Sequence, residues 1–451
     1  MEIKSFRLQN VGRFKDLDMT LAPTDKHFSN VTVLVGNNGA GKTTLLKSLA
    51  TSLSWLVARI RSEKGNGSPI GDEDILNGAS AAGISIAVSD DVGESISQPN
   101  TAMFEWMLAR PRQGRKTDTH SSFTDVSRLA DLYRIRLTED ETASLPLIAY
   151  YPVERSVLEI PLKIRTKHSF DQLDGYDNAL SRGVDFRRFF EWFREREDAE
   201  NESGVSSTVL TEISNKYGKD SHIWNALTDL KASTRDRQLT AVRTAISTFM
   251  PGFTNLRVQR KPRLHMAIDK HGVKLNVSQL SQGEKSMMAL VGDIARRLAM
   301  MNQSLANPLQ GDGIVLIDEV DLHLHPKWQR NLVRQLSETF PNCQFVLTTH
   351  SPLVISDAKD VLCYVLSDGE LQECNDLYGL DANQVLLSVM DTDVRNTQIQ
   401  QRLDQLFEFL QDGKLAEAKN EYHSLADELP KGHLELTKAA LLIRKLELRR
   451  A

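Results

Sequence analysis

Residues 36 to 44 read Gly36-Asn37-Asn38-Gly39-Ala40-Gly41-Lys42-Thr43-Thr44, and the fold is decided by this stretch. It matches G-x-x-x-x-G-K-[ST], the pattern of a phosphate-binding loop. The apolar, β-branched run Val31–Val35 precedes it and predicts a buried strand. From Thr44 to Ile60 apolar residues recur at helical spacing, which predicts a helix. Strand, glycine loop and helix are the context that this motif needs; the alternative is an ordinary glycine turn before a helix.

The residue types in this loop suit phosphate chemistry. Glycines let backbone N–H groups turn toward phosphate oxygens, and the N-terminus of the following helix adds partial positive charge. Lys42 is expected to reach the β- and γ-phosphates, and the Thr43 hydroxyl is expected to be a Mg²⁺ ligand. The stretch therefore predicts a nucleoside triphosphate bound with Mg²⁺.

Composition sets limits on the function. The chain has 451 residues, enough for two or three domains, and a net charge of −5, which gives no support for tight binding of nucleic acid, although a local basic groove stays open. Its three cysteines show no C-x-x-C pairing, so neither a zinc site nor a disulfide framework is expected. The N-terminus lacks the apolar core of a signal peptide, and no apolar run approaches the roughly 20 residues of a membrane span. We expect a cytoplasmic protein without a membrane partner.

The first third of the chain is rich in predicted strands. Ile3–Leu8 and Leu17–Leu21 alternate apolar and polar residues around a turn near Gly12. Ile84–Val88 and Phe104–Leu108 show strand character on either side of a polar loop. The chain is therefore expected to open with a small antiparallel sheet beside a parallel core.

Loop, strand and helix patterns alternate in the middle of the chain. Arg110–Thr124 is basic and poor in apolar residues, and it is either an exposed loop or a contact to a nucleic-acid backbone. Leu145–Tyr151 predicts another buried strand. Phe186–Phe249 is charged and helical in pattern, typical of an inserted subdomain, and strand character returns at Leu256–Val258 and Leu264–Ile268.

A second loop stands before a helix. Leu280-Ser281-Gln282-Gly283-Glu284-Lys285-Ser286 precedes an amphipathic pattern that starts at Met288. Ser281 and the backbone at Gly283 would lie at a helix N-terminus, where they can bind phosphate oxygens. The alternative is a local capping box, with Ser281 as N-cap and Glu284 three residues later.

Two acidic residues follow a buried strand. Ile314–Ile317 is wholly apolar, and Asp318 and Glu319 come directly after it, at the strand edge where parallel α/β sheets bind ligands. Asp318 is placed to hold Mg²⁺, and Glu319 is placed to orient and deprotonate an attacking water.

A histidine ends the last predicted strand. Phe345–Thr349 is followed by His350, which can reach a γ-phosphate from the strand end. His323 and His325 lie between these motifs and, with the two acids above, raise the alternative of a zinc site.

In this order the motifs resemble those of the ABC-type ATPases. Gly36–Thr44 corresponds to Walker A, Leu280–Glu284 to the signature, Ile314–Glu319 to Walker B, Val320–Leu322 to the D-loop and His350 to the switch histidine. The resemblance implies that ATP lies between two heads. Ser281 of one head would then face the γ-phosphate held by Lys42 of the other, which implies a head-to-tail dimer at minimum.

Longer stretches resemble the ATPases of bacterial anti-phage systems, namely the PtuA-like ATPases of Septu and the retron and overcoming-lysogenization-defect (OLD) types. The stretches are Leu145–Arg155, Glu319–Gln329, Thr348–Pro352 and Leu377–Leu386. The Septu resemblance implies a separate HNH-family nuclease partner that cuts DNA. The tail after Gly369 shows helical spacing and no acidic Toprim set.

Two family positions have no match here. No Gln ends the strand 145–151, where transporters have their Q-loop and where Glu154 and Arg155 stand in this chain. Gly12 occupies the place of the adenine-side Arg of repair ATPases, with Arg13 beside it.

The expected fold is therefore an α/β ABC-ATPase head, with a parallel-core sheet, an antiparallel edge sheet, a helical insert and a helical tail. The predicted division is 1–160 (Walker A lobe), 161–255 (helical insert), 256–375 (signature, Walker B and switch lobe) and 376–451 (tail). The tail is expected either to dock a partner or to pack within an ATPase oligomer. The leading hypothesis is a regulatory ATPase of an anti-phage nuclease complex. The alternatives are a stand-alone RecF/SMC-like repair ATPase and a self-contained nuclease.

Overall fold

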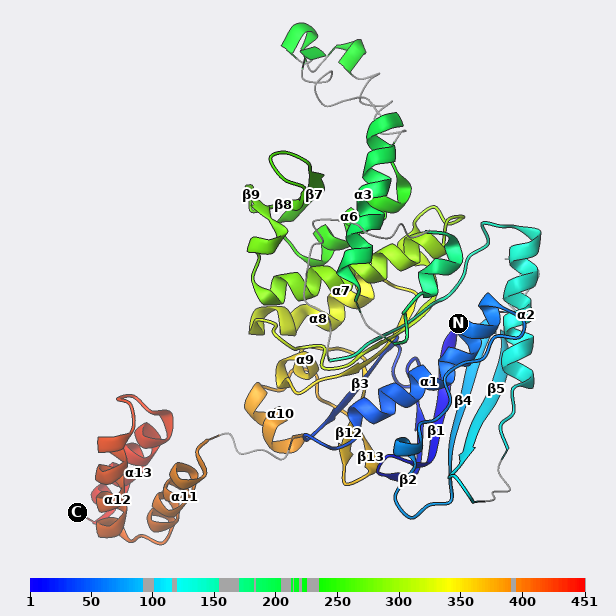
Figure 1. Cartoon of the computed structure of the whole chain (residues 1–451). Coiled ribbons are helices and arrows are strands. Elements are labelled where there is room, and N and C mark those ends of the chain that lie inside the picture. Colours follow the sequence, from blue (N-terminus) through cyan, green and yellow to red (C-terminus); the bar gives the residue numbers. More distant parts are fainter. Residues whose placement is uncertain are drawn as a thin grey trace. The chain divides into compact units, whose positions relative to one another are not determined.

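The computed structural model contains a six-stranded sheet in the order β13-β12-β3-β11-β10-β6. Three of its strands, β3, β12 and β13, are labelled in Figure 1. Its strands are β3 (Val31–Gly36), β6 (Leu147–Tyr151), β10 (Gly313–Ile317), β11 (Cys343–Thr348), β12 (Leu362–Ser367) and β13 (Glu370–Cys374). The structure describes residues 1–91, 101–115, 120–153, 170–181, 184–203, 212–213, 215–218, 221–224, 235–390 and 395–450. They form two compact units, Met1–Asp381 and Ala382–Ala451.

Parallel pairing of five strands places the motifs at one edge. β12, β3, β11, β10 and β6 pair in parallel, and only β13 runs antiparallel at the rim. Strands β3 and β10 are buried along their whole length, because both faces of a parallel sheet are covered. The carboxyl ends of β3, β6, β10 and β11 therefore meet at the same edge, which is where ligands bind in such sheets.

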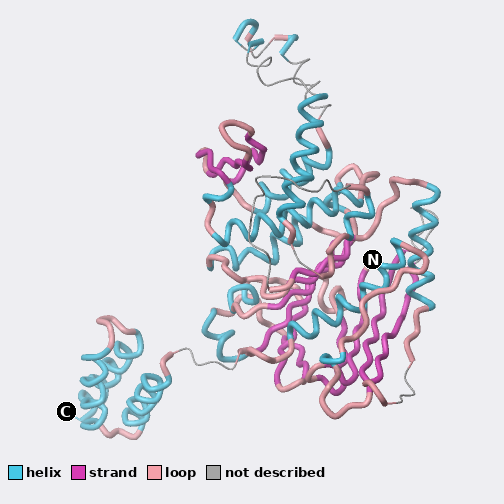
Figure 2. Tube along the Cα trace, in the orientation of Figure 1, coloured by secondary structure: helices cyan, strands magenta, loops and turns pink. Residues whose placement is uncertain are grey.

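A four-stranded antiparallel sheet stands beside this core, in the order β2-β1-β4-β5. Its strands are β1 (Glu2–Val11), β2 (Phe14–Thr20), β4 (Ala81–Asp91) and β5 (Thr101–Pro111). The two sheets lie side by side (Figure 2). The Ile3 N–H donates to Gln344 Oε1 in β11 over 2.8 Å and so links them. The predicted antiparallel sheet beside a parallel core is confirmed.

Helix α1 (Lys42–Arg61) joins the two sheets because it contacts β4 on one side and β3, β6, β10 and β11 on the other. Its predicted apolar residues are all buried: Leu45, Leu49, Leu53, Leu56 and Ile60. Helix α2 (Thr124–Glu139) packs on α1 and β5. Within the basic stretch 110–124, β5 continues to Pro111 and Ser122 bridges back to Met107. Because α1 packs against both sheets and against α2, its position is fixed, and the loop at its amino end is held in place.

The predicted helical insert contains α3 (Phe186–Ser203) and α6 (Arg237–Phe249), which both pack on α7 (Gln282–Met301) (Figure 1). A small sheet follows α6, formed by β7 (Phe253–Gln259), β8 (His265–Lys270) and β9 (Val273–Asn276). Helices α8 (Pro326–Thr339) and α9 (Pro352–Ser356) complete the first unit. Helices α3 and α6 of the predicted insert therefore pack against α7, the helix that follows the signature.

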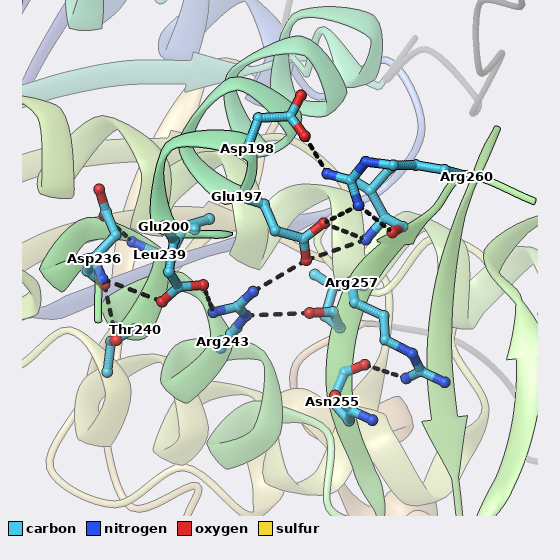
Figure 3. Close-up of polar contacts among 12 residues, drawn as sticks. Glu197, Asp198, Glu200, Asp236, Leu239, Thr240, Arg243, Asn255, Arg257 and Arg260 are labelled. Atoms are coloured by element: carbon cyan, nitrogen blue, oxygen red, sulfur yellow. Dashed lines mark hydrogen bonds and ion pairs between the residues drawn. The ribbon is translucent and has the colours of Figure 1, made fainter. Parts of the chain in front are cut away.

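Charged side chains join α3, α6 and β7. We call this group the arm-base cluster, and it consists of Glu197, Glu200, Asp236, Arg243 and Arg260 (Figure 3). Glu197 is buried, accepts the Val258 N–H over 3.0 Å and accepts Arg243 Nη2 over 3.1 Å. Glu200 accepts Arg243 Nη1 over 2.8 Å and the Asp236 N–H over 3.1 Å. Burial raises the pKa of Glu197, although the hydrogen bond from Val258 and the two nearby guanidinium groups, Arg243 and Arg260, oppose the rise. The cluster thus fixes where α3 meets α6.

The second unit is helical, as predicted for the tail. It contains α10 (Ala382–Ser388), α11 (Thr397–Gln411), α12 (Leu415–Glu428) and α13 (Leu434–Arg450). The last three helices share an apolar core of Leu403, Leu406, Leu410, Ala418, Leu425, Leu436, Ala439 and Ile443. Among the described residues, no helix has the length and apolarity that crossing a membrane requires.

Candidate functional site

The loop between β3 and α1 is shaped by glycines that nothing larger could replace. A Cβ at Gly36 would lie 2.4 Å from the carbonyl oxygen of Leu366. Gly41 caps α1 with a φ of 107°, and a Cβ there would lie 2.5 Å from Phe14 Cζ. Asn37, Asn38 and Gly39 are exposed, whereas Ala40 is buried. Close packing therefore fixes the loop at Gly36 and Gly41, while its middle residues 37–39 are exposed to solvent.

Lys42 lies under this loop, with only 6% of its surface exposed. Its Nζ donates to the carbonyl oxygens of Gly36 over 2.7 Å and Asn37 over 3.2 Å. Burial lowers the pKa of Lys42, while the negative charges of Asp318, Glu319 and Asp321 act in the opposite direction. The ammonium group and the acids that follow β10 thus share one electrostatic field, as expected for a Walker A and Walker B pair.

The two acids after β10 lie in different environments. Asp318 is fully buried, its N–H donates to the Tyr151 carbonyl over 2.9 Å, and its Oδ1 accepts Thr348 Oγ1 over 2.5 Å. Glu319 has a φ of 44°, a left-handed value that costs a non-glycine residue about 1–3 kcal/mol. Its N–H donates to Thr348 Oγ1 over 2.7 Å. One threonine hydroxyl therefore holds both the Asp318 carboxylate and the strained turn at Glu319.

One oxygen of this acidic pair has no partner. Asp318 Oδ2 is buried and accepts no hydrogen bond. An unpaired buried carboxylate oxygen is costly, and no side chain that the structure describes donates to it, so a bound cation would stabilise it. Thr43, the second residue of α1, is exposed at the adjacent loop. A carboxylate and a hydroxyl are oxygen ligands of the type that Mg²⁺ prefers, and the residues present fit that ion.

The end of β11 is connected to the end of β10 by side chains. Thr349 Oγ1 donates to Asp321 Oδ1 over 2.5 Å, and the His350 N–H donates to the same oxygen over 3.4 Å. Ser351 Oγ donates to Gln329 Oε1 over 2.9 Å. His350 is partly exposed. The predicted switch histidine therefore stands at the same sheet edge as Asp318 and Glu319.

The signature residues form a separate group. Ser281 caps α7: its Oγ accepts the Glu284 N–H over 3.4 Å, and Glu284 Oε2 accepts the Ser281 N–H over 2.9 Å. Burial opposes the fall, but hydrogen bonds from Lys270 and Ser281 lower the pKa of Glu284. A Cβ at Gly283 would lie 2.4 Å from the carbonyl oxygen of His323, so only glycine fits against that backbone. The capping box and the exposed helix N-terminus therefore coexist.

The zinc alternative finds no support in the part of the chain that the structure describes. No three or more His, Cys, Asp or Glu residues gather there in a way that could hold a metal ion as a group. His325 instead caps α8, because its Nδ1 accepts the Lys327 N–H over 3.2 Å.

One contributor, Phe14, was not singled out from the sequence. Asp321 and Thr348 belong to stretches that were singled out, 320–322 and 348–352, but their hydrogen bonds to Thr349 and Asp318 were not predicted. Polar threonines at the end of a buried strand were the available signal for Thr348. Phe14 lies against Gly41 and could not be placed without the fold. Arg13 Cδ would lie 3.3 Å from a Cβ at Gly41, which puts this exposed residue beside the loop. The other open position, Glu154 and Arg155, lies outside the described residues.

Comparison with known proteins agrees with this geometry. Residues 31–356 match the family model AAA_21, described as "AAA domain, putative AbiEii toxin, Type IV TA system". The chain belongs to this family of AAA-domain ATPases. It is an ATPase with a nucleotide-binding head. Residues 1–59 also match a second AAA-domain model, AAA_27.

Curated relatives extend the match. The Retron Ec83 probable ATPase of Escherichia coli is 33% identical over 407 residues, which cover 82% of this chain and 72% of the relative. The Retron Vc95 probable ATPase of Vibrio cholerae serotype O1 biovar El Tor is 33% identical over 420 residues, 87% of this chain and 79% of the relative. The Septu protein PtuA of Bacillus mycoides (strain KBAB4) is 39% identical over 97 residues, 22% and 13% of the two chains. A solved SMC head bound to the C-winged helix domain of ScpA aligns with a TM-score of 0.43 at 14% identity, over 83% of this chain and 98% of the other. The resemblance to retron and Septu ATPases is confirmed.

Proposed function

We propose that ATP binds at the loop 36–44 and is hydrolysed at the adjacent strand ends. The phosphates would take the place of the two carbonyl oxygens that Lys42 now contacts, because their charge attracts the ammonium more strongly. Asp318 Oδ2 and the Thr43 hydroxyl would hold a Mg²⁺ ion, which neutralises phosphate charge when it is bound. Glu319 would orient and deprotonate the attacking water, and His350 would contact the γ-phosphate. The unpartnered buried oxygen of Asp318 is the observation that carries this assignment.

A second copy would complete the site. Ser281, Gly283 and Glu284 lie at the N-terminus of a 20-residue helix, which can bind phosphate, and the side-chain hydrogen bonds described for Ser281 and Glu284 run to each other and to Lys270 rather than to the loop 36–44. A head-to-tail dimer would bring this N-terminus to the γ-phosphate of the other copy. The predicted lobes 1–160 and 256–375 would then lie on opposite sides of each bound ATP, with the insert 161–255 and the tail 376–451 outside it.

At the level of the cell, the chain would be the cytoplasmic regulatory ATPase of a bacterial anti-phage complex. The support is the 33% identity to two retron ATPases over more than four fifths of this chain, together with the local match to Septu PtuA. A separate HNH-family nuclease would cut DNA, and the ATP state of the heads would control it. DNA would be contacted through this complex.

Co-purification with the product of the adjacent gene, followed by plasmid cleavage with and without ATP, tests this function. Cleavage by the co-purified complex that changes with ATP, and no such change in a Lys42→Ala complex, is the expected result. The absence of any partner, together with DNA-stimulated ATP hydrolysis by the chain alone, would replace it with the RecF/SMC-like repair ATPase.

A further inference from the structure

Tyr151 contacts two parts of the ATPase that the sequence keeps far apart. It is the last residue of β6, lies opposite Ile317 of β10, and is 1% exposed. Its carbonyl oxygen accepts the Asp318 N–H over 2.9 Å. Its hydroxyl donates to Asp293 Oδ2 of α7 over 3.0 Å. A single buried residue therefore contacts the signature helix through its side chain and, through its backbone carbonyl, the residue that bears the unpartnered carboxylate oxygen.

Asp293 is a firmly held anchor for that hydroxyl. It is fully buried and also accepts Arg296 Nη2 and Arg297 Nε, each over 2.7 Å. Arg297 Nη1 continues to the Gly175 carbonyl over 2.5 Å and to the Asp177 carbonyl over 3.1 Å. Because Asp293 accepts hydrogen bonds from Tyr151, Arg296 and Arg297 at once, the carboxylate cannot turn away from Tyr151 without breaking this network.

The geometry of α7 makes this contact sensitive to the signature. Asp293 follows Ser281 by twelve residues in one uninterrupted helix, a distance of about 18 Å along its axis. A helix buried along most of its length moves as a unit, so a shift at its N-terminus also displaces Asp293. The displaced carboxylate would pull the Tyr151 hydroxyl through their hydrogen bond and so shift the end of β6.

We propose that Tyr151 is a positioning residue, which sets the place of Asp318 according to the position of the signature helix. It does not contact the nucleotide itself. The proposal rests on the role proposed above for Asp318, and it assigns to the hydroxyl a function beyond filling the core. Loss of the hydroxyl leaves the ring in place but disconnects α7 from the backbone beside Asp318.

Tyr151→Phe in the full chain tests the proposal, with Tyr133→Phe as the matched control. Tyr133 is also buried, and its hydroxyl also donates to a buried carboxylate, that of Asp90, but in the antiparallel sheet. Both substitutions thus remove one hydroxyl from one buried acid. We expect Tyr151→Phe to lower kcat about tenfold with the KM for ATP unchanged, and Tyr133→Phe to leave both constants at the parent values.

Hydrogen–deuterium exchange without nucleotide supplies a readout that does not depend on turnover. In Tyr151→Phe the amide of Asp318 should exchange faster than in the parent, whereas Tyr133→Phe should leave it protected. Parent-like kcat and parent-like protection in Tyr151→Phe would overturn the proposal, and so would equal losses in both variants. Asp318→Asn distinguishes a failure of this proposal from a failure of the proposed function. If that variant hydrolyses ATP at the parent rate, the proposed role of Asp318 is wrong.

Discussion

Replacing Asp293 with Asn should destabilise the first unit strongly. Arg296 and Arg297 are each 1% exposed and both depend on this one carboxylate for charge compensation. Removing one partner of a buried ion pair leaves an uncompensated charge, which costs about 3–5 kcal/mol. That is a large part of the roughly 5–15 kcal/mol that holds a domain folded. With a urea m-value of about 3 kcal/mol per M, the midpoint should fall by about 1–2 M.

Tryptophan fluorescence during urea unfolding is the suitable assay. All five tryptophans of the chain lie before residue 330, so the signal reports on the first unit and not on the helical tail. Asp16→Asn is the control, because Asp16 forms an exposed ion pair with Arg7 and its loss should leave the midpoint in place. A midpoint for Asp293→Asn within the error of the parent would refute the reasoning that the buried charges need each other.

The pH dependence of the unfolding free energy gives a second check on the ion pairs of Asp293 with Arg296 and Arg297. Burial opposes ionisation, yet Arg297 and Arg296 outweigh it and lower the pKa of Asp293 from 3.8 to about 2. A depressed carboxyl pKa stabilises the folded state fully above the unfolded pKa, and this stabilisation is lost as the pH falls toward the folded pKa. The difference in unfolding free energy between parent and Asp293→Asn should therefore narrow by about 1 kcal/mol between pH 6 and pH 3. If the difference in unfolding free energy stayed constant or widened toward pH 3, the two arginines would not lower the pKa of Asp293.

Four further substitutions test the site. Lys42→Ala should abolish tight ATP binding in a calorimetric titration, since it removes the charge facing the phosphates; unchanged affinity would exclude that role. Glu319→Gln should keep ATP bound but lower phosphate release at least about 100-fold, and a parent rate would show that another group is the base. Gly283→Ala should retain ATP affinity but lose hydrolysis, because its Cβ would clash with the His323 backbone at 2.4 Å; full activity would show that this contact yields easily. Thr348→Val should lower kcat about tenfold while leaving nucleotide affinity intact, as the hydroxyl holds two Walker B groups; a loss of affinity with normal kcat would argue against it.

Much of the fold could be predicted because its signals are local. Val31–Val35, Leu145–Tyr151 and Ile314–Ile317 are apolar runs of strand length, and each forms a strand of the central sheet. The capping box at Ser281 depends only on residues three positions apart, and it forms as its spacing predicts. Periodicity cannot order strands within a sheet, so the neighbours of β3 became known only from the structure.

The connections within the site were beyond the sequence for a physical reason. The Tyr151 hydroxyl and Asp293 are 142 positions apart, and the Thr348 hydroxyl and Asp318 are 30 apart. Such bonds depend on side-chain direction and on which strands are adjacent, and a motif specifies neither. Motifs identified the chemical groups at the sheet edge, while the groups that hold them required the three-dimensional arrangement.

The arm-base cluster has a consequence for how α3 and α6 can move. Glu200 near the end of α3 accepts the N–H of Asp236, just before α6, so the chain departs and returns at one place that the head itself defines. Arg243 and Glu197 reinforce that junction from α6 and α3 (Figure 3). The ends of α3 and α6 are therefore joined by side chains of these two helices themselves. A change at this junction would move α3 and α6 together, and both helices pack on the helix that follows the signature.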